Sequence, residues 1–254
     1  MTAEYGAPWA VILGASCGTG AAIARAVARD PGFDIFGAHR GHHPEKAEAL
    51  ATFVRGHQRN IHLRQADAGT AESADRGTDE LLRVAGPRSV KLFVHSIANA
   101  SIGGLTREEG HRLTPGQIQK TLESMASSFV YWAQELVSKD LLAPRAHLLG
   151  LSNPMPDVIA RDTAAIGAAK AALEVYIRHL ARELGPRGHR VNLLKFGAIV
   201  TPAMARTLGG RLPALERALH DAIPAQRLCT LDEVGRFVAV LAGEAAAWFN
   251  GATR

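Results

Sequence analysis

The sequence contains few cysteines, few aromatic residues and no long apolar run. Among its 254 residues are two cysteines, Cys17 and Cys229, and aromatic residues make up 6%. Two cysteines so far apart, without a Cys-x-x-Cys spacing, argue against a disulfide framework and against a zinc site. No stretch approaches the roughly 18 consecutive apolar residues that a membrane-spanning helix needs. The first residues carry Glu4 and no basic flank before an apolar run, so we expect no signal peptide and a cytoplasmic protein.

The sequence also has no segment in which charges of one sign are concentrated. Lys and Arg number 29 against 24 Asp and Glu, which gives a formal net charge of +5. No block of five or six like charges occurs, so we expect no nucleic-acid partner. An anionic small molecule or an acidic carrier protein fits this mild basicity better. Histidines number 11, but pairs such as His42-His43 lack further ligands at zinc spacing, and we expect no bound metal.

Short apolar runs alternate with amphipathic stretches along the chain. The runs are rich in Val, Ile, Leu and Phe and mostly do not alternate with polar residues, which is typical of parallel strands buried on both faces. Six such runs separated by helices predict an α/β fold with a doubly wound parallel sheet, the Rossmann fold. The expected strands are Ala10–Leu13, Asp34–Ala38, Ile61–Ala66, Val90–Ser96, Ala146–Leu151 and Arg190–Lys195, and the expected helices include Ala21–Ala28, Thr121–Leu136 and Thr163–Leu184.

The chain shows no linker, internal repeat or low-complexity tract that would divide it. We therefore expect residues 1–254 to form a single dinucleotide-binding domain. The segment Pro213–Pro224 encloses a short helical pattern, Ala214–Ala222. This segment predicts a small helical lid around residues 202–226 rather than a second domain.

A glycine-rich segment follows the first expected strand and opens a helix. It contains Gly14, Ser16, Gly18, Thr19 and Gly20. Glycine has no Cβ, so the chain can turn sharply here and let a pyrophosphate approach the backbone N–H groups at the positive end of the helix. A glycine-rich turn without a ligand is the alternative, but its place between strand and helix favours dinucleotide binding.

The G-x3-G-x-G spacing of this segment resembles that of the short-chain dehydrogenase/reductase family, and the resemblance extends from Val11 to about Gly243. After the fourth strand, His95-Ser96-Ile97-Ala98 resembles the His-Ser-Ile-Gly sequence of the enoyl-acyl-carrier-protein reductase branch. Phe196-Gly197-Ala198-Ile199-Val200-Thr201 resembles the family's Pro-Gly-x-Ile-x-Thr segment. The resemblance implies cofactor contacts from Asp67 at the adenine, from Ser96, Ile97 and Ala98, and from Gly197, Ile199 and Thr201.

The residue after the second strand predicts which dinucleotide binds. Family members that prefer NAD place an acidic residue there, whereas this chain has His39-Arg40. A guanidinium pairs well with a 2′-phosphate, so Arg40 favours NADP(H) over NAD(H), which stays open as the alternative. A solvated loop arginine is the other interpretation.

The catalytic residues of the resembling family are only partly present. Its lysine corresponds to Lys170, which the resemblance places at the nicotinamide ribose. Its tyrosine stands four residues earlier, at Ile166, or seven earlier in enoyl reductases, at Thr163. Its serine corresponds to Asn153, which follows Ser152. A threonine hydroxyl is too weak an acid to replace a phenol, although it can orient water or a substrate carbonyl.

The absence of a tyrosine at both positions predicts a particular chemistry. Ketone reduction must protonate an alkoxide, whereas enoyl reduction passes through an enolate that hydrogen-bond donors can hold. We therefore expect an NADP(H)-dependent reductase of an enoyl thioester or related unsaturated carbonyl compound, with the substrate free or bound to a carrier protein. Lys170, Thr163, Asn153 and Ser152 are the predicted catalytic residues. A non-redox enzyme on this scaffold, such as a dehydratase or cyclase, and a dinucleotide-binding pseudoenzyme remain alternatives.

The resemblance further implies a homodimer or homotetramer. The large side chains of Tyr131, Trp132 and Tyr176 lie on the expected helices that pair across a two-fold axis in the family, and we expect them to be exposed in a single chain. The family also continues into a seventh strand, whereas here Asn250–Arg254 closes the sequence.

Overall fold

A computed structural model describes residues 7–106, 110–154, 156–157, 160–201, 204–205 and 209–252 of the chain. Within these residues, six parallel strands form one sheet in the order β3-β2-β1-β4-β5-β6. The order reverses between β1 and β4, which is the switch point of a doubly wound sheet. The predicted fold class is confirmed. The strands are β1 (Trp9–Leu13), β2 (Asp34–His39), β3 (Ile61–Gln65), β4 (Val90–His95), β5 (Leu142–Ser152) and β6 (Arg190–Lys195).

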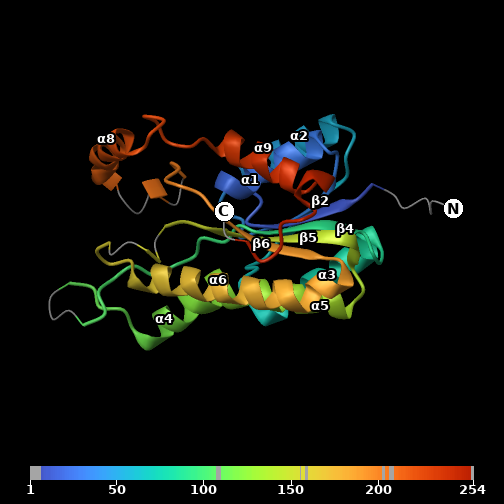
Figure 1. The fold of residues 1–254 in the computed structure, drawn as a ribbon, viewed down its shortest axis with the longest axis horizontal. Coiled ribbons are helices and arrows are strands. Elements are labelled where there is room, and N and C mark those ends of the chain that lie inside the picture. The colour runs from blue at the N-terminus through green and yellow to red at the C-terminus, as the bar shows by residue number, and fades with distance from the viewer. Residues whose placement is uncertain are drawn as a thin grey trace.

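Helices cover both faces of the sheet (Figure 1). One face carries α1, α2 and α9, and the other carries α3 to α6. The helices are α1 (Gly18–Arg29), α2 (Pro44–Gly56), α3 (Ala71–Ala85), α4 (Pro115–Leu122), α5 (Ser128–Ser138), α6 (Ala164–Leu184), α8 (Leu212–Ala222) and α9 (Leu231–Leu241), with a π-helix η1 (Glu123–Ser127) and short 3₁₀ turns η2 (Gly185–Arg187), η3 (Gly209–Arg211) and η4 (Glu244–Ala246).

Each central strand contributes to two apolar cores because its side chains point alternately to the two faces. In β1, Val11 and Leu13 pack against the α3–α6 layer, whereas Ala10 and Ile12 pack against the α1–α9 layer. All four are fully buried. This double burial explains why the sequence of the strand reads as a continuous apolar run.

The helix expected over Thr121–Leu136 is interrupted. Its middle, Glu123–Ser127, is a π-helix that separates α4 from α5. A π-turn inserts one extra residue and is frequently found at functional sites. Likewise, Thr163 does not belong to α6 but precedes it as the N-cap. Both differences fall beside the predicted catalytic residues.

Trp132 is not the exposed side chain that we expected. It is fully buried, and its Nε1 donates a hydrogen bond to the carbonyl oxygen of Ala68 at 3.0 Å. A Cβ built on Gly77 of α3 would lie 2.4 Å from the Trp132 ring, so this glycine makes room for the indole. The side chain is therefore covered within one chain and needs no partner subunit.

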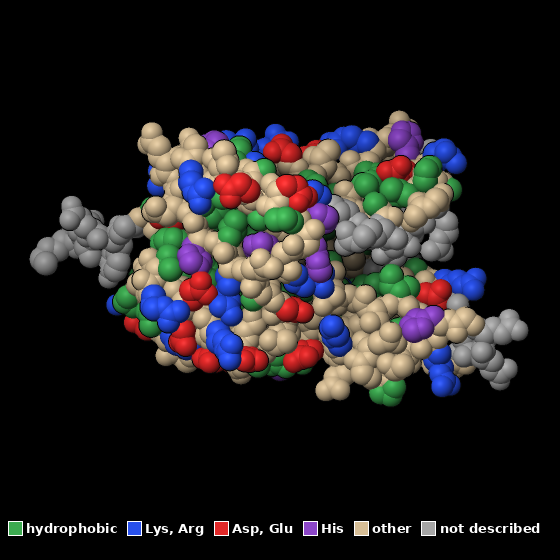
Figure 2. All heavy atoms as spheres, turned by 180° about the vertical axis from the view of Figure 1, so that it is seen from behind, with side chains coloured by type: hydrophobic (Ala, Val, Ile, Leu, Met, Phe, Trp, Pro, Cys, Tyr) green, Lys and Arg blue, Asp and Glu red, His purple; other side chains and the backbone are tan. Residues whose placement is uncertain are grey.

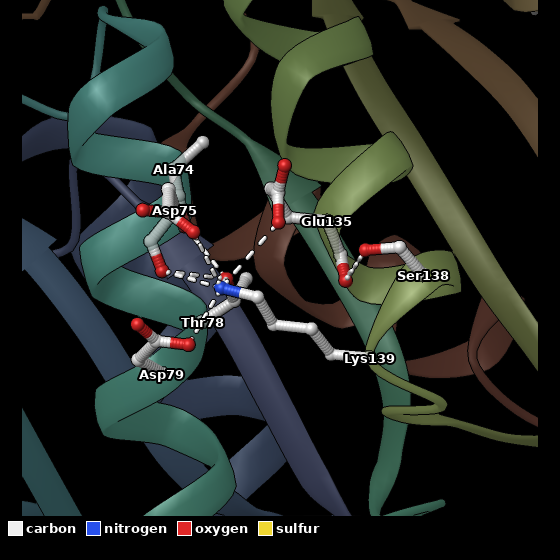
Figure 3. A network of polar contacts seen from close by, with 7 residues as sticks. All are labelled: Ala74, Asp75, Thr78, Asp79, Glu135, Ser138 and Lys139. Atoms are coloured by element: carbon white, nitrogen blue, oxygen red, sulfur yellow. Dashed lines mark hydrogen bonds and ion pairs between the residues drawn. The ribbon is translucent and has the colours of Figure 1, made fainter.

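A charged cluster joins α3 to α5 (Figure 3). The Lys139 ammonium lies 2.8 Å from Asp75 Oδ1 and 2.7 Å from Asp79 Oδ1, and it also donates to the hydroxyl of Thr78. Glu135 lies one turn before Lys139 and adds a contact at 3.4 Å. Hydrogen bonds to the two aspartates raise the pKa of Lys139 to about 12.

The free edge of β6 is partly covered by residues near the end of the chain. The N–H of Gly251 donates to Val191 O, and the N–H of Leu193 donates to Ala252 O. The Asn250 side chain accepts from the Val191 N–H. These bonds extend the sheet beyond β6. In the part of the chain that the structure describes, no helix is long and apolar enough to cross a membrane.

Candidate active site

The glycine segment forms a tight turn between β1 and α1. Gly14 has φ +84°, and a Cβ added to it would lie 2.3 Å from the carbonyl oxygen of Ser96. A Cβ added to Gly20 would lie 2.2 Å from Gly14 O, so α1 packs directly against the turn. Backbone bonds from Gly14 and Ala15 to Ala38 O tie the turn to the end of β2. Only glycine fits these two close approaches.

A cavity of about 570 Å³ opens over this turn at the carboxyl ends of β1 to β4. This is the place where open α/β sheets bind their ligands, next to the switch point. Ten of the predicted cofactor-binding residues line it, namely Gly14, Ser16, Gly18, Thr19, Arg40, Asp67, Ser96, Ile97, Ala98 and Thr201. The other four, Gly20, Lys170, Gly197 and Ile199, do not line it directly.

Basic side chains gather at the β2 end of the cavity. His39, Arg40, His42 and His43 all line it, and Figure 2 shows several histidine side chains gathered about the middle of one face of the molecule. His39 Nδ1 accepts a hydrogen bond from the Gly41 N–H, and burial lowers the pKa of this imidazole. The carboxylate that lines the cavity is that of Asp67.

The cavity fits a dinucleotide on physical grounds. The first N–H groups of α1 have no partner within the helix and lie at its positive end, where a pyrophosphate is stabilised. The Ser16–Thr19 segment that opens α1 lines the cavity. Asp67 stands at the carboxyl end of β3 and its Oδ1 accepts from the Gly69 N–H at 3.0 Å, which holds the carboxylate in one orientation.

Lys170, a predicted catalytic residue, lies on α6. Its side chain is buried, and its Nζ donates to the carbonyl oxygen of Leu151 at 2.6 Å. Burial lowers the pKa of this ammonium to about 8. An ammonium group has three donors, so two remain for a ligand after the bond to Leu151.

His95 lies beside Lys170 and is completely buried at the end of β4. Its Nε2 lies 2.8 Å from Ser128 Oγ, and that hydroxyl donates its hydrogen to Ser124 O. The ring therefore donates through Nε2–H. Burial and the charge of Lys170 lower the pKa of His95 to about 3, so the imidazole is neutral at physiological pH.

The residues that occupy the tyrosine and serine positions carry no phenol. Ile166 is half-buried on α6. The Thr163 hydroxyl donates to Ala160 O at 2.9 Å. Ser152 is buried as the last residue of β5, and Asn153 follows it. The predicted catalytic residues thus lie at the ends of β5 and the start of α6, but neither threonine nor serine is a strong acid.

Sequence reasoning missed three features of this site. The π-helix η1 gave no signal, because a single extra residue hardly changes the apolar pattern. Asn99 lines the cavity, although only its place after His95-Ser96-Ile97-Ala98 could have suggested it. A second cavity of about 300 Å³ shares Asp67 with the first; it is lined by Asp67, Gly69, Thr70, Gly116, Gln119, Lys120, Glu123 and Ser124.

Comparison with known proteins places this geometry in a family. The family model described as "Enoyl-(Acyl carrier protein) reductase" matches residues 14–254. The chain belongs to this branch of the short-chain dehydrogenases/reductases. The resemblance carried by the glycine segment and by His95-Ser96-Ile97 is thereby confirmed.

Individual relatives are distant. An uncharacterized oxidoreductase of Methylorubrum extorquens is 27% identical over 243 residues, which are 95% of this chain and 93% of the relative. The 1-cyclohexenylcarbonyl-CoA reductase of Streptomyces collinus is 27% identical over 96% of this chain and 83% of its own. The enoyl-[acyl-carrier-protein] reductase [NADH] FabI of Escherichia coli is 29% identical over 159 residues, 63% of this chain and 59% of its own.

Solved structures agree with the fold. A short-chain dehydrogenase from Burkholderia cenocepacia in complex with NADP has a TM-score of 0.84 at 24% identity and covers 97% of this chain and 94% of its own. L-Sorbose reductase from Gluconobacter frateurii, complexed with NADPH and L-sorbose, has a TM-score of 0.82 at 21% identity and covers 100% and 96%. Identities this low establish the shared fold alone.

Proposed function

We propose that this oxidoreductase reduces the carbon–carbon double bond of an α,β-unsaturated acyl thioester with NADPH. The observation that carries the proposal is the retention of the buried Lys170 beside a dinucleotide-sized cavity, while Ile166 and Thr163 remove the phenol. Two relatives, named as an enoyl-[acyl-carrier-protein] reductase and a 1-cyclohexenylcarbonyl-CoA reductase, support an unsaturated acyl substrate.

The residues around the cavity have separate tasks in this proposal. The Ser16–Thr19 turn and the start of α1 hold the pyrophosphate, and Asp67 holds the adenine. Lys170 uses its two remaining donors on the nicotinamide ribose, and Thr201 with Ile199 lies at the carboxamide. When bound, the dihydronicotinamide supplies the hydride.

The lack of a phenol decides between two types of carbonyl chemistry. Removal of a general acid typically costs on the order of 10²–10⁴ in rate when a strongly basic oxygen must be protonated. An enolate spreads its charge and is stabilised by hydrogen-bond donors, so water can protonate it afterwards. The site therefore suits an enoyl compound better than a ketone. Ser152, Asn153 and Thr163 stay the predicted donors, although they do not line the cavity. The hydroxyls of Ser152 and Thr163 donate to the carbonyl oxygens of Asn153 and Ala160 in the structure, so they have to turn to reach a substrate.

Arg40 and its neighbouring imidazoles favour NADP(H) as the cofactor. They line the β2 end of the cavity, where a 2′-phosphate would lie. The NADP and NADPH complexes of the two solved relatives agree with this choice, whereas the name of FabI specifies NADH. NADH is thus the competing cofactor in the test below.

We also propose that α8 and the segment before it act as a lid over the substrate. α8 lies toward the end of the molecule where α6 begins (Figure 1). Part of this predicted lid, residues 202–203 and 206–208, lies outside the described residues.

The test is NADPH oxidation, followed by absorbance, with a series of trans-2-enoyl thioesters presented on coenzyme A and on a carrier protein. Turnover of NADPH with at least one of them is expected. Conversion of the thioester without NADPH oxidation would instead indicate a dehydratase or cyclase. Tight NADPH binding with no conversion of any thioester would indicate a pseudoenzyme.

A further inference from the structure

We propose that the side-chain amide of Asn99 is the hydrogen-bond donor for the carbonyl oxygen of the acyl substrate, in the task that a tyrosine hydroxyl would otherwise serve. This proposal rests on the proposed function, because it assigns the group that receives the substrate carbonyl. It adds a residue that neither the glycine segment nor the lysine helix contains.

Asn99 lies on the loop that follows β4 and lines the large cavity. It stands four residues after His95, so it continues the Ser96-Ile97-Ala98 wall of the cavity. Thr201, from the segment after β6, lines the same cavity. Asn99 therefore lies where it can contact a ligand in this cavity.

The backbone of this loop is held from two sides. Ser124 of η1 donates its hydroxyl hydrogen to Asn99 O at 2.8 Å, and the Ser101 N–H donates to Thr121 Oγ1 at 3.0 Å. At the other end, the Ser96 N–H donates to Leu13 O at 3.0 Å. The backbone that carries the amide is thus fixed, so only side-chain torsions have to change when a ligand binds.

The Asn99 side chain has an unsatisfied donor. Its Nδ2 is buried and, among the described residues, has no hydrogen-bond partner. A buried amide without a partner is costly, and use of the donor by a ligand or a reaction is one physical reason for a protein to keep it. The terminal torsion of asparagine is soft, so the proposal requires only a rotation about it to present the NH₂ group to the cavity.

The ligand atom must be an oxygen acceptor. The NH₂ group of the Asn99 amide only donates, so its partner has to be an acceptor. A fixed donor of this kind favours an oxygen that gains negative charge during the reaction. The carbonyl oxygen of an unsaturated thioester does so when hydride adds to its β-carbon.

In the proposed reaction, two new C–H bonds replace the π bond of the substrate. Hydride from the dihydronicotinamide forms the new C–H bond at the β-carbon, and the π electrons of the double bond move to form an enolate. The NH₂ group of Asn99 donates to the enolate oxygen throughout and loses no proton. Water then gives a proton to the α-carbon, forming the second C–H bond, and the hydroxide left behind takes up a proton from the solvent. Oxidised dinucleotide and saturated thioester leave.

The test compares the wild type with Asn99→Leu, which keeps the size of the side chain and removes the donor, and with Asn99→Ala. Gln119→Leu, which removes an exposed amide at the second cavity, is the matched control. NADPH affinity, measured by fluorescence titration, serves as the check that each variant is folded and is expected to change by about twofold or less.

Two readouts decide the proposal. The enoyl-reduction kcat should fall on the order of 10²–10³ in both Asn99 variants, as for loss of one oxyanion donor, and not in Gln119→Leu. The infrared stretch of a ¹³C-labelled thioester carbonyl, bound with oxidised cofactor, should shift to lower frequency in the wild type and lose that shift in both variants. An unchanged frequency and rate in Asn99→Leu would overturn the proposal.

The same data separate this inference from the proposed function. If the wild type oxidises no NADPH but the Asn99-dependent frequency shift is present, the donor site is right and the reaction is wrong. If the wild type reduces enoyl thioesters and the Asn99 variants are unaffected, the reaction is right and the donor is wrong. If no acyl thioester binds to the wild type, the donor assignment fails.

Discussion

Lys170 combines an ammonium group with nearly complete burial, and this combination has a measurable consequence for the protein without cofactor. Its one hydrogen-bond acceptor among the described residues is Leu151 O. Burial lowers its pKa from 10.5 to about 8. Between these values the unfolded chain holds more protons on this side chain than the folded chain does. The free energy of unfolding therefore rises with pH in this window, and the cost of the buried charge is fully present below about pH 8.

We predict that Lys170→Met stabilises the cofactor-free protein at pH 7. The lowered pKa corresponds to at most about 3 kcal/mol, or several degrees in Tm. The gain should shrink as pH rises from 8 and be nearly absent at about pH 10.5. Calorimetry of both proteins across this range is the measurement. A difference in Tm that does not depend on pH would contradict the burial of a charged Lys170.

A second prediction at this scale concerns Lys170 and the cofactor. Lys170→Met should weaken NADPH binding at least about tenfold, because the ammonium no longer reaches the ribose hydroxyls. Lys170→Arg, which keeps the positive charge, should restore part of the affinity. Fluorescence titration measures both. Wild-type affinity in the Met variant would mean that this lysine serves the fold alone.

Arg40 should decide the choice between the two dinucleotides. Arg40→Ala is expected to weaken NADPH binding by about tenfold or more while leaving NADH affinity nearly unchanged, because only NADPH carries the 2′-phosphate. Titration of both cofactors against both proteins checks this. Equal affinities of the wild type for NADPH and NADH would contradict the preference for NADPH that we assign to Arg40.

At the scale of elements, the Lys139 cluster is a clamp between α3 and α5. Lys139→Met should lower the free energy of unfolding by about 1 kcal/mol, or Tm by about 2–4 °C, and high salt should reduce the effect. Arg76→Met is the control, because its pair with Glu72 is solvent-exposed on α3. Thermal melts at low and high salt measure both. An equal effect of the two substitutions would show that the Lys139 cluster does not stabilise the contact between α3 and α5.

Some of the elements could be predicted from the sequence, and others could not. The strands could be predicted to within a few residues, because burial on both faces leaves continuous apolar runs such as Val11–Leu13. The π-helix η1 could not, because it depends on tertiary contacts such as the bond from Ser124 to Asn99 O. Thr163 shares the helical spacing of Lys170, yet its hydroxyl bonds to Ala160 O and the helix begins after it.

The same is true of the site, where some features follow from the local sequence and others depend on distant contacts. Glycines and the strand ends that line the cofactor cavity follow from local geometry, since a strand-to-helix turn needs Gly14 and Gly20. The burial of Trp132 did not follow, because it depends on Gly77 of another helix. The unsatisfied amide of Asn99 is visible only once the loop after β4 is placed over the cavity.

For the whole molecule, we predict a homodimer or homotetramer. Val175 and Tyr176 of α6 remain exposed in the single chain, at 43% and 37%, and exposed apolar side chains of this size are covered by a partner in many oligomers. Light scattering at micromolar concentration should give a multiple of the chain mass. The double substitution Val175→Asp, Tyr176→Asp should shift the mass toward the monomer, whereas Val84→Asp on α3 should not. A monomeric wild type would refute the prediction.

We propose that this oxidoreductase acts on unsaturated thioesters, because neither Ile166 nor Thr163 supplies a phenol at the positions that precede Lys170. The most direct measurement compares the NADPH-dependent rates of the wild type and Ile166→Tyr with an enoyl thioester and a β-ketoacyl thioester of equal chain length. The wild type should reduce the enoyl compound at least about tenfold faster. Ile166→Tyr, which places a phenol one helical turn from Lys170, should raise the ketone rate. A wild type that reduces the ketone as fast as the enoyl compound would contradict the account.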